Sequence, residues 1–261
     1  MRIFIKRLKV LKKAIRLASL TLLMILSLTT ISSYGAQIKV VTEYFPPYQI
    51  LNSDGSLGGF STEVVLELFK LTGDTPDIHT MPWARAYDTV KKSKNVMVFT
   101  IAHTDIRHGL FQWVGRLSGE YLYIWGLKSR FNQPFESLEQ MHPYSIATSR
   151  HSNPDQYFTA HQFEHLYRLV KPDQNLGMLL TRRIDLIISS EQSLKIRLNK
   201  MKIDLSMLTK VFKIEALNNN LSIAFNLNSD HQLVSRYQQA FEVLEKRGTI
   251  NVLKRKWSIR D

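Results

Sequence analysis

Two successive runs of alternating strand-like and helix-like segments limit the folds open to this chain more than any other feature. The first run has strand-like segments at 38–44, 77–81 and 96–102, with helix-like segments at 61–71 and 82–92 between them. In the helix-like segments, apolar residues recur at the spacing of one helix face. Strands that alternate with helices are typical of a parallel sheet covered by helices, so this run predicts one α/β unit.

A second run with the same order begins at residue 144. Its segments are strands at 144–148, 166–170 and 184–189 and helices at 154–163 and 173–181. A short strand at 223–226 and helices at 232–247 and 250–257 close the chain. We therefore expect an α/β protein with two lobes, each a mainly parallel sheet flanked by helices. In such sheets a ligand binds beyond the carboxyl ends of the strands.

The first 36 residues have the composition of an export signal. Seven basic and no acidic residues precede an uncharged stretch at 17–31, and small residues follow it. This order is typical of a secretory signal peptide. We expect residues 1–36 to be removed and the mature protein to work in the periplasm, and an uncleaved membrane anchor is the alternative. The chain has no cysteine, which excludes disulfide bonds and a lipid anchor on cysteine.

The positive charge of the chain is concentrated in this leader. The whole sequence has a net charge of +13, whereas residues 37–261 have 28 basic and 22 acidic residues and a net charge of +6. These residues contain no stripe of lysine and arginine interleaved with aromatic residues. We therefore expect no nucleic-acid partner.

Aromatic and basic side chains follow three consecutive strands of the first run. Tyr44 ends the first strand, Trp83 follows the second, and Thr100, Thr104 and Arg107 belong to or follow the third. Because carboxyl ends of parallel strands meet at one edge of a sheet, we expect these residues to line one cleft. An arginine shielded from water grips a carboxylate through two parallel hydrogen bonds. The alternatives are core packing for the rings and a solvated position for Arg107.

The motifs around these residues resemble those of periplasmic solute-binding proteins of family 3, the amino-acid type that serves ABC importers. In chain order they are Tyr44…Pro46-Pro47-Tyr48, Gly55…Gly58-Gly59-Phe60, Trp83-Ala84-Arg85-Ala86, Thr104-Asp105-Ile106-Arg107 with Phe111…Trp113-Val114-Gly115, Arg183-Ile184-Asp185, and Gly248…Lys256-Trp257. No single motif is specific, but together they extend over nearly all of residues 37–261.

The resemblance implies a type II periplasmic-binding-protein fold with two hinge crossovers. Lobe 1 would comprise residues 37–125 and 223–261, and lobe 2 residues 126–222. The crossovers would lie near 123–125 and 221–223. Binding would close the lobes over the ligand by a hinge motion.

The resemblance also implies roles for individual residues. Arg107 would grip the α-carboxylate of the ligand, and Tyr44 and Trp83 would enclose its side chain. Hydroxyl groups on the segment from Thr100 to Thr104 would donate further hydrogen bonds.

Three positions depart from the family pattern. Ala102 stands where a hydroxyl residue is usual, and His151-Ser152 stands where glycine precedes serine or threonine. Ser190 stands where an aspartate pairs with the α-ammonium, with Glu191 next to it. A buried ammonium needs a charged or fully hydrogen-bonded partner. Either Glu191 supplies it, or the ligand lacks an α-ammonium.

We therefore expect a non-catalytic, monomeric receptor that binds a small carboxylate-bearing solute, without metal or cofactor, and delivers it to an ABC-type permease or a sensor. The first alternative is a periplasmic enzyme similar to cyclohexadienyl dehydratases, with Glu191, Glu43 or His103 as the acid. The second is a receptor domain with a degenerate pocket that binds a protein partner.

Overall fold

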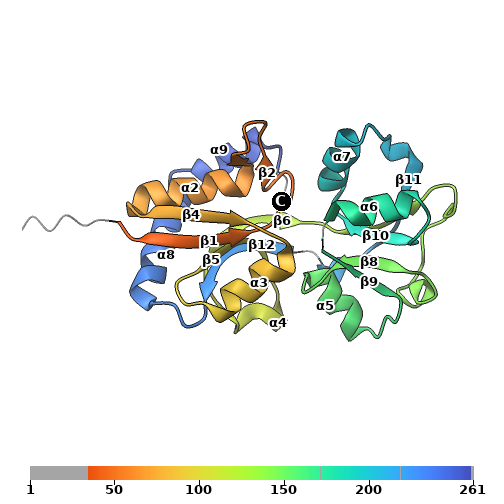
Figure 1. Cartoon of the computed structure of the whole chain (residues 1–261), viewed down its shortest axis with the longest axis horizontal. Helices are drawn as coiled ribbons and strands as arrows, with labels where there is room; N and C mark the ends of the chain where they lie inside the picture. The colour runs from red at the N-terminus through yellow and green to blue at the C-terminus, as the bar shows by residue number, and fades with distance from the viewer. Residues whose placement is uncertain (1–34, 171, 218, 260–261) are drawn as a thin grey trace, which may run out of the picture. The chain divides into compact units, whose positions relative to one another are not determined.

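The computed structural model describes residues 35–170, 172–217 and 219–259. Most of the predicted signal peptide, residues 1–34, lies outside the described residues. Residues 36–261 form one compact unit, which is drawn in Figure 1. Among the described helices, none has the length and apolar character needed to cross a membrane.

The first sheet has the strand order β4-β1-β5-β12-β6. Its strands are β1 (Gln37–Thr42), β4 (Thr75–Thr80), β5 (Met97–His103), β6 (Phe111–Glu120) and β12 (Asn219–Asn226). β1 is parallel to β4 and β5, whereas β12 is antiparallel to both β5 and β6. β6 therefore runs in the same direction as β1, and both strands end at the same edge of the sheet.

Helices cover both faces of this sheet (Figure 1). They are α2 (Phe60–Thr72), α3 (Trp83–Lys92), the short α4 (Asp105–His108), α8 (His231–Lys246) and α9 (Thr249–Lys256). α2, α8 and α9 pack on the face that carries Val40, and α3 packs on the face that carries Val41. Adjacent residues of β1 thus enter different cores, as the two-residue period of a strand requires.

The second sheet has the strand order β11-β7-β10-β8-β9. Its strands are β7 (Tyr123–Leu127), β8 (Ile146–Ser149), β9 (Leu166–Leu169), β10 (Leu186–Ser189) and β11 (Leu208–Lys213). α5 (Asn153–Ala160) packs on one face, and α6 (Pro172–Leu180) and α7 (Glu191–Lys200) pack on the other. Short elements complete the chain, namely the hairpin β2 (Ile50–Leu51) and β3 (Leu57–Gly58) and the 3-10 turns Glu139–Met141, Leu205–Met207 and Glu215–Leu217.

The predicted alternation of strands and helices is confirmed, but β6, β7, β11 and α7 are absent from the sequence prediction. β6 escapes it because Gly115, Arg116 and Gly119 interrupt its apolar pattern. Gly115 has a packing role, since an added Cβ would lie 2.3 Å from the ring of Phe241. The predicted lobe limits at 125 and 223 stay predictions. The strands change sheet slightly earlier, between residues 120 and 123 and between 213 and 219.

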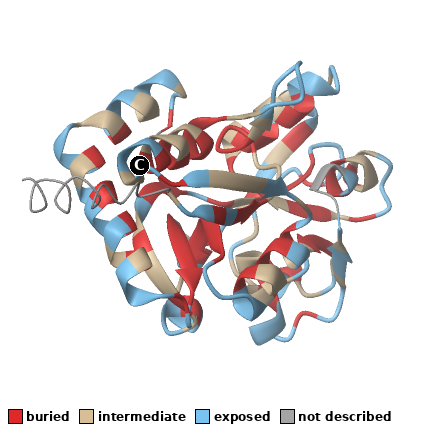
Figure 2. Cartoon of the chain, turned by 60° about the vertical axis from the view of Figure 1, so that its left-hand side comes forward, coloured by how far each residue is buried: buried red, intermediate tan, exposed pale blue. Residues whose placement is uncertain are grey.

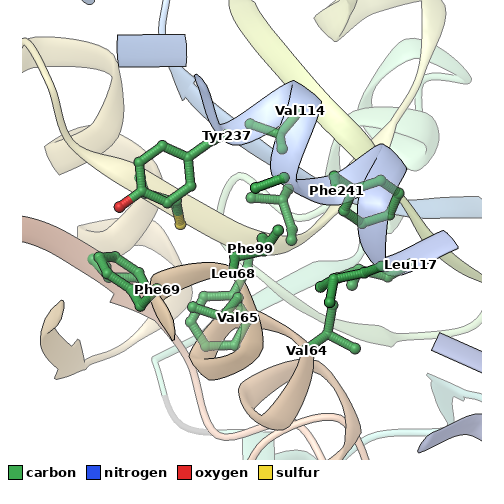
Figure 3. Close-up of a cluster of buried hydrophobic side chains, with 14 of the residues drawn as sticks. Val64, Val65, Leu68, Phe69, Phe99, Val114, Leu117, Tyr237 and Phe241 are labelled. Carbon is green, nitrogen blue, oxygen red and sulfur yellow. The ribbon is translucent and has the colours of Figure 1, made fainter. Parts of the chain in front are cut away.

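The core of the first sheet shows why α2 forms. Its residues Val64, Val65, Leu68 and Phe69 recur at helical spacing and pack toward Phe99, as Figure 3 shows. Gly73 ends the helix in the left-handed conformation with φ 74°, which glycine adopts without steric cost. Figure 2 shows buried residues gathered on the strands and on the helix faces that cover them.

Gly59 fixes the start of α2 against the loop that follows β1. It has φ 104°, and a Cβ at this position would lie 2.5 Å from the carbonyl oxygen of Tyr48. The same carbonyl accepts a hydrogen bond from the backbone N–H of Ser61 at 3.0 Å. The close approach of these two segments therefore requires glycine.

Gly59→Ala should lower the free energy of unfolding by more than about 2 kcal/mol, because it combines a strained φ with a backbone clash. Urea unfolding measures this change. Gly177→Ala is the matched control, because a Cβ added at Gly177 in α6 would meet no atom within 4 Å apart from the neighbouring backbone of its own helix. It should stabilise the protein by about 0.5–1 kcal/mol through helix propensity. Equal stability of the two variants would contradict the role of Gly59.

Candidate functional site

A cavity of about 140 Å³ lies between the two sheets. Residues of the first sheet and its connections line one side, including Glu43, Tyr44, Trp83, Thr100, Ala102, Arg107 and Glu120. Residues of the second line the other side, including Thr148, Ser149, Ser152, Asn175, Ser193 and Arg197. Many of them lie at or just beyond the carboxyl ends of strands, where ligands bind in sheets of this kind.

Six of the nine residues predicted for the site line this cavity. They are Tyr44, Trp83, Thr100, Ala102, Arg107 and Ser152. The other three, Thr104, Ser190 and Glu191, do not line it. Thr104 and Ser190 stand at the N-caps of α4 and α7, and the Ser190 hydroxyl accepts a hydrogen bond from the N–H of Ser193.

Glu191 faces two lysines and not the cavity. Its carboxylate oxygens lie 2.5 Å from Nζ of Lys195 and 2.5 Å from Nζ of Lys210. Hydrogen bonds from these lysines lower the pKa of Glu191 to about 2. Because both oxygens are engaged, Glu191 is not placed to neutralise a cation in the cavity.

Arg107 joins the two lobes through its guanidinium. Nη1 donates to the carbonyl of Ala102 at 3.3 Å, within the first lobe. Nη2 donates to the carbonyl of His151 at 2.8 Å, and Nε donates to Oε1 of Gln156 at 3.1 Å, both in the second lobe. The side chain is only 1% exposed.

Two aromatic rings flank the guanidinium of Arg107. Its Cζ lies 5.8 Å from the ring centre of Trp83 and 5.1 Å from that of Tyr87, within the range of a cation–π contact. Burial lowers the pKa of Arg107 to about 10, which leaves it charged at neutral pH. The alternative of a solvated surface arginine does not fit this burial.

His151 is the point at which the second lobe meets the first. Its carbonyl accepts a hydrogen bond from Nε1 of Trp83 at 3.0 Å as well as the one from Arg107. Its own N–H donates to Oδ2 of Asp155 at 2.9 Å, and its ring stacks on Tyr87. His151 has φ 63°, so it adopts the left-handed conformation that glycine would favour. The sequence marked this position only as a departure from the family pattern.

A β-bulge turns Thr100 toward the cavity. In the pairing of β5 with β12, Phe99 opposes Ile223 and Ile101 opposes Ser222, so Thr100 has no partner of its own. Thr100 has φ 62°, and its hydroxyl accepts a hydrogen bond from Nε2 of Gln49. Bulges re-aim side chains next to functional sites in this way.

Two carboxyl groups line the cavity, Glu43 after β1 and Glu120 at the end of β6. Burial raises the pKa of each to about 8, against the ordinary value of 4.5. The charge of Arg107 opposes this rise at Glu43. At Glu120 a hydrogen bond from the Ser190 hydroxyl opposes it, and the charge of Glu43 adds to it. Both groups therefore hold a proton at neutral pH.

The sequence signal for these two carboxyls differs. The sequence analysis already names Glu43, beside Tyr44 at the end of the first predicted strand, as a candidate acid of the alternative enzyme. Glu120 could not be found in this way, because β6 was not predicted. Glu120 is 5% exposed, and among the described residues its Oε1 has no hydrogen-bond partner.

Comparison with known proteins gives similarity at the level of structure only. No protein-family model matches the chain, and no curated protein sequence matches it. It is similar to a histidine kinase sensor domain with similarity to periplasmic binding proteins, with a TM-score of 0.76 and 17% identity over 86% of this chain and 96% of that one.

Two further solved structures are similar over comparable lengths. A mutant of ArgBP from T. maritima gives a TM-score of 0.74 and 17% identity over 88% of this chain and 98% of that one. A putative L-cystine ABC transporter from Listeria monocytogenes gives a TM-score of 0.71 and 21% identity over 85% of this chain and 95% of that one. The predicted two-lobe periplasmic-binding-protein fold is therefore confirmed.

The two cavity carboxyls, Glu120 buried and Glu43 half-buried, should make the protein less stable as the pH rises. A folded-state pKa of about 8 exceeds the ordinary 4.5, so the folded state binds more protons than the unfolded state between these values. The free energy of unfolding should then fall from about pH 5 to pH 8, by up to about 1.4 kcal/mol per pH unit for each carboxyl.

Glu120→Gln should make this fall shallower and leave the variant more stable than the wild type at pH 9. Urea unfolding at pH 5, 7 and 9 measures the slope. Glu242→Gln, an exposed change on α8, is the control and should keep the wild-type slope. Parallel curves for wild type and Glu120→Gln would show that Glu120 does not hold the proton.

Proposed function

We propose that the chain is an exported, non-catalytic receptor for a small carboxylate-bearing solute, an amino acid or a related acid. It captures the solute in the cavity between the two sheets and delivers it to an ABC-type permease or a sensor. The observation that carries this proposal is the placement of two buried arginines, Arg107 and Arg197, on opposite sides of one small cavity.

The size of the cavity limits the solute. Its volume of about 140 Å³ is close to the ~150 Å³ of an engineered cavity that accommodates benzene. It is smaller than the ~300–1,000 Å³ of pockets for drug-sized ligands. A solute of this size has few non-hydrogen atoms, as a small amino acid has.

The two arginines supply the positive charge that a carboxylate needs. Arg197 of α7 is 6% exposed, and its Nη2 donates to Oδ1 of Asn175 at 2.6 Å. Arg107 donates to backbone carbonyls, which are weaker acceptors for a guanidinium than a carboxylate. An entering carboxylate would therefore compete for the guanidinium of Arg107, while the rings of Tyr44 and Trp83 enclose the rest of the solute.

The proposed output follows from the similar structures. The similar structures include the substrate-binding protein of an amino acid ABC transporter and a histidine kinase sensor domain. Delivery to a permease and delivery to a sensor are both compatible with a receptor that closes on its solute. We propose that the mature receptor is a periplasmic monomer whose lobes open to admit the solute and close over it by hinge bending.

Thermal unfolding with a library of amino acids, hydroxy acids and aromatic acids tests this function. A solute that binds only the folded protein should add about 2.7 kcal/mol at a hundredfold excess over its Kd. Arg107→Lys keeps the charge but loses the planar fork, so it should weaken binding at least about tenfold.

Arg85→Lys is the matched control, because Arg85 lies on α3 beside Trp83 but is exposed. It should bind like the wild type, and circular dichroism should show that both variants fold. If no acid in the library stabilises the wild type, the proposed function is wrong.

A catalytic alternative rests on Glu43 and Glu120. Carboxyls with a pKa of about 8 could act as general acid or base near neutral pH, as a cyclohexadienyl dehydratase-like reaction would need. Incubation with prephenate separates the two functions. A receptor returns prephenate unchanged, whereas an enzyme of this kind converts it to phenylpyruvate with loss of water and carbon dioxide, as the general acid protonates the departing hydroxyl group.

A further inference from the structure

We propose that Glu43 and Glu120 together form the subsite for a positively charged group of the solute, an ammonium or a guanidinium, and that this group displaces a proton from the pair when it binds. The inference rests on the proposed function and names the chemical class of solute that the cavity selects. The cationic subsite would then lie in the first lobe. The sequence analysis instead suggested Glu191, which belongs to the second lobe.

The topology of the first sheet brings the two carboxyls together. β1 and β6 run in the same direction and end at the same edge, although β5 and β12 separate them in the sheet. Glu43 directly follows β1, and Glu120 is the last residue of β6. Both line the cavity, and the charge of one affects the ionisation of the other.

One oxygen of Glu120 lacks a hydrogen-bond partner. Among the described residues, its Oε1 is buried and has no partner. A buried polar atom without a partner is costly, and once Glu120 gives up its proton this oxygen can accept a hydrogen bond from an N–H group of a solute. An unpartnered carboxyl that lines a cavity is therefore a ready contact for a donor.

Among the described residues, the hydrogen bonds of the neighbouring cationic side chains are directed to groups other than these two carboxyls, so a solute can supply the positive charge. Arg107 of α4 lies near Glu43, but its donors are directed to Ala102, His151 and Gln156. Ser190 reaches Glu120 as a neutral hydroxyl. Arg197 of α7 lines the cavity and bonds to Asn175. Lys200 of the same helix lies over the ring of Tyr44, 5.4 Å from its centre.

Protonation follows from this arrangement. Burial keeps both carboxyls neutral near pH 7, because an unpaired buried charge is costly and two such charges repel each other. A cation that enters favours the ionised form, so one proton leaves the pair as the cation arrives. Binding should therefore strengthen as the pH rises toward 8 and then level off.

Isothermal titration calorimetry tests the inference on protein produced from the full-length sequence. The probes are matched small solutes, L-alanine with ammonium and carboxylate, L-lactate with carboxylate only, and ethylamine with ammonium only. L-Arginine and putrescine extend the series to longer cations. Titration at pH 6, 7, 8 and 9, in two buffers of different ionisation enthalpy, gives the number of protons released per bound solute.

At least one ammonium-bearing solute should bind at least about tenfold more tightly than L-lactate. It should release about one proton at pH 6 to 7 and almost none at pH 9, with Kd falling up to about tenfold per pH unit below pH 8. Glu43→Gln and Glu120→Gln, which keep the shape of the side chain, should each lose most of the proton release and weaken binding. Glu242→Gln, exposed on α8, should match the wild type.

Three results would overturn the inference. If L-lactate binds as well as L-alanine and the glutamine variants bind like the wild type, the cationic subsite is wrong while the receptor function stands. If affinity falls as the pH rises, the protonated carboxyls donate hydrogen bonds to an anion instead. If no solute of the series binds at any pH although an acid of the thermal-unfolding library stabilises the protein, the inference fails and the receptor function stands; if no acid of that library stabilises it either, both fail.

Discussion

The hydrogen bonds of Arg107 are the interaction on which the rest of this structure depends. One guanidinium bonds to Ala102 of its own lobe and to His151 and Gln156 of the other. A buried charge of this kind is stable only when its donors are satisfied. The contact is therefore specific, because it forms only when the carbonyl of His151 reaches the space between Arg107 and Trp83.

The contact between the lobes shields the cavity from water, and this shielding determines the protonation of the carboxyl groups in it. With the lobes in contact, Glu43 and Glu120 are desolvated and their pKa rises to about 8. The cavity thus combines positive charge on Arg107 and Arg197 with two carboxyl groups, which we propose lose a proton when a cation arrives. An acid-binding group and a cation-binding group within one small space fit a zwitterionic solute better than a simple carboxylate.

Local patterns predict most of the fold, and six of the nine residues predicted for the site line the cavity, which has 22 lining residues. The helical spacing in α2 and the position of Arg107 after β5 are visible in the sequence because they depend on nearby residues. The roles of His151 and Glu120 are not, because they depend on contacts between segments far apart in the chain. His151 acts through its backbone carbonyl, which any residue would supply. Glu120 ends β6, where glycines interrupt the apolar pattern that would indicate a strand.

The distance between the lobes, measured with and without the Arg107 side chain, tests most directly whether Arg107 holds them together. Because the chain has no cysteine, spin labels at Lys94→Cys and Glu164→Cys, both exposed, report only on these positions. Double electron–electron resonance should give a longer mean distance and a broader distribution for Arg107→Met than for the protein that keeps Arg107. The same distance distribution in both proteins would contradict the claim that Arg107 holds the lobes together.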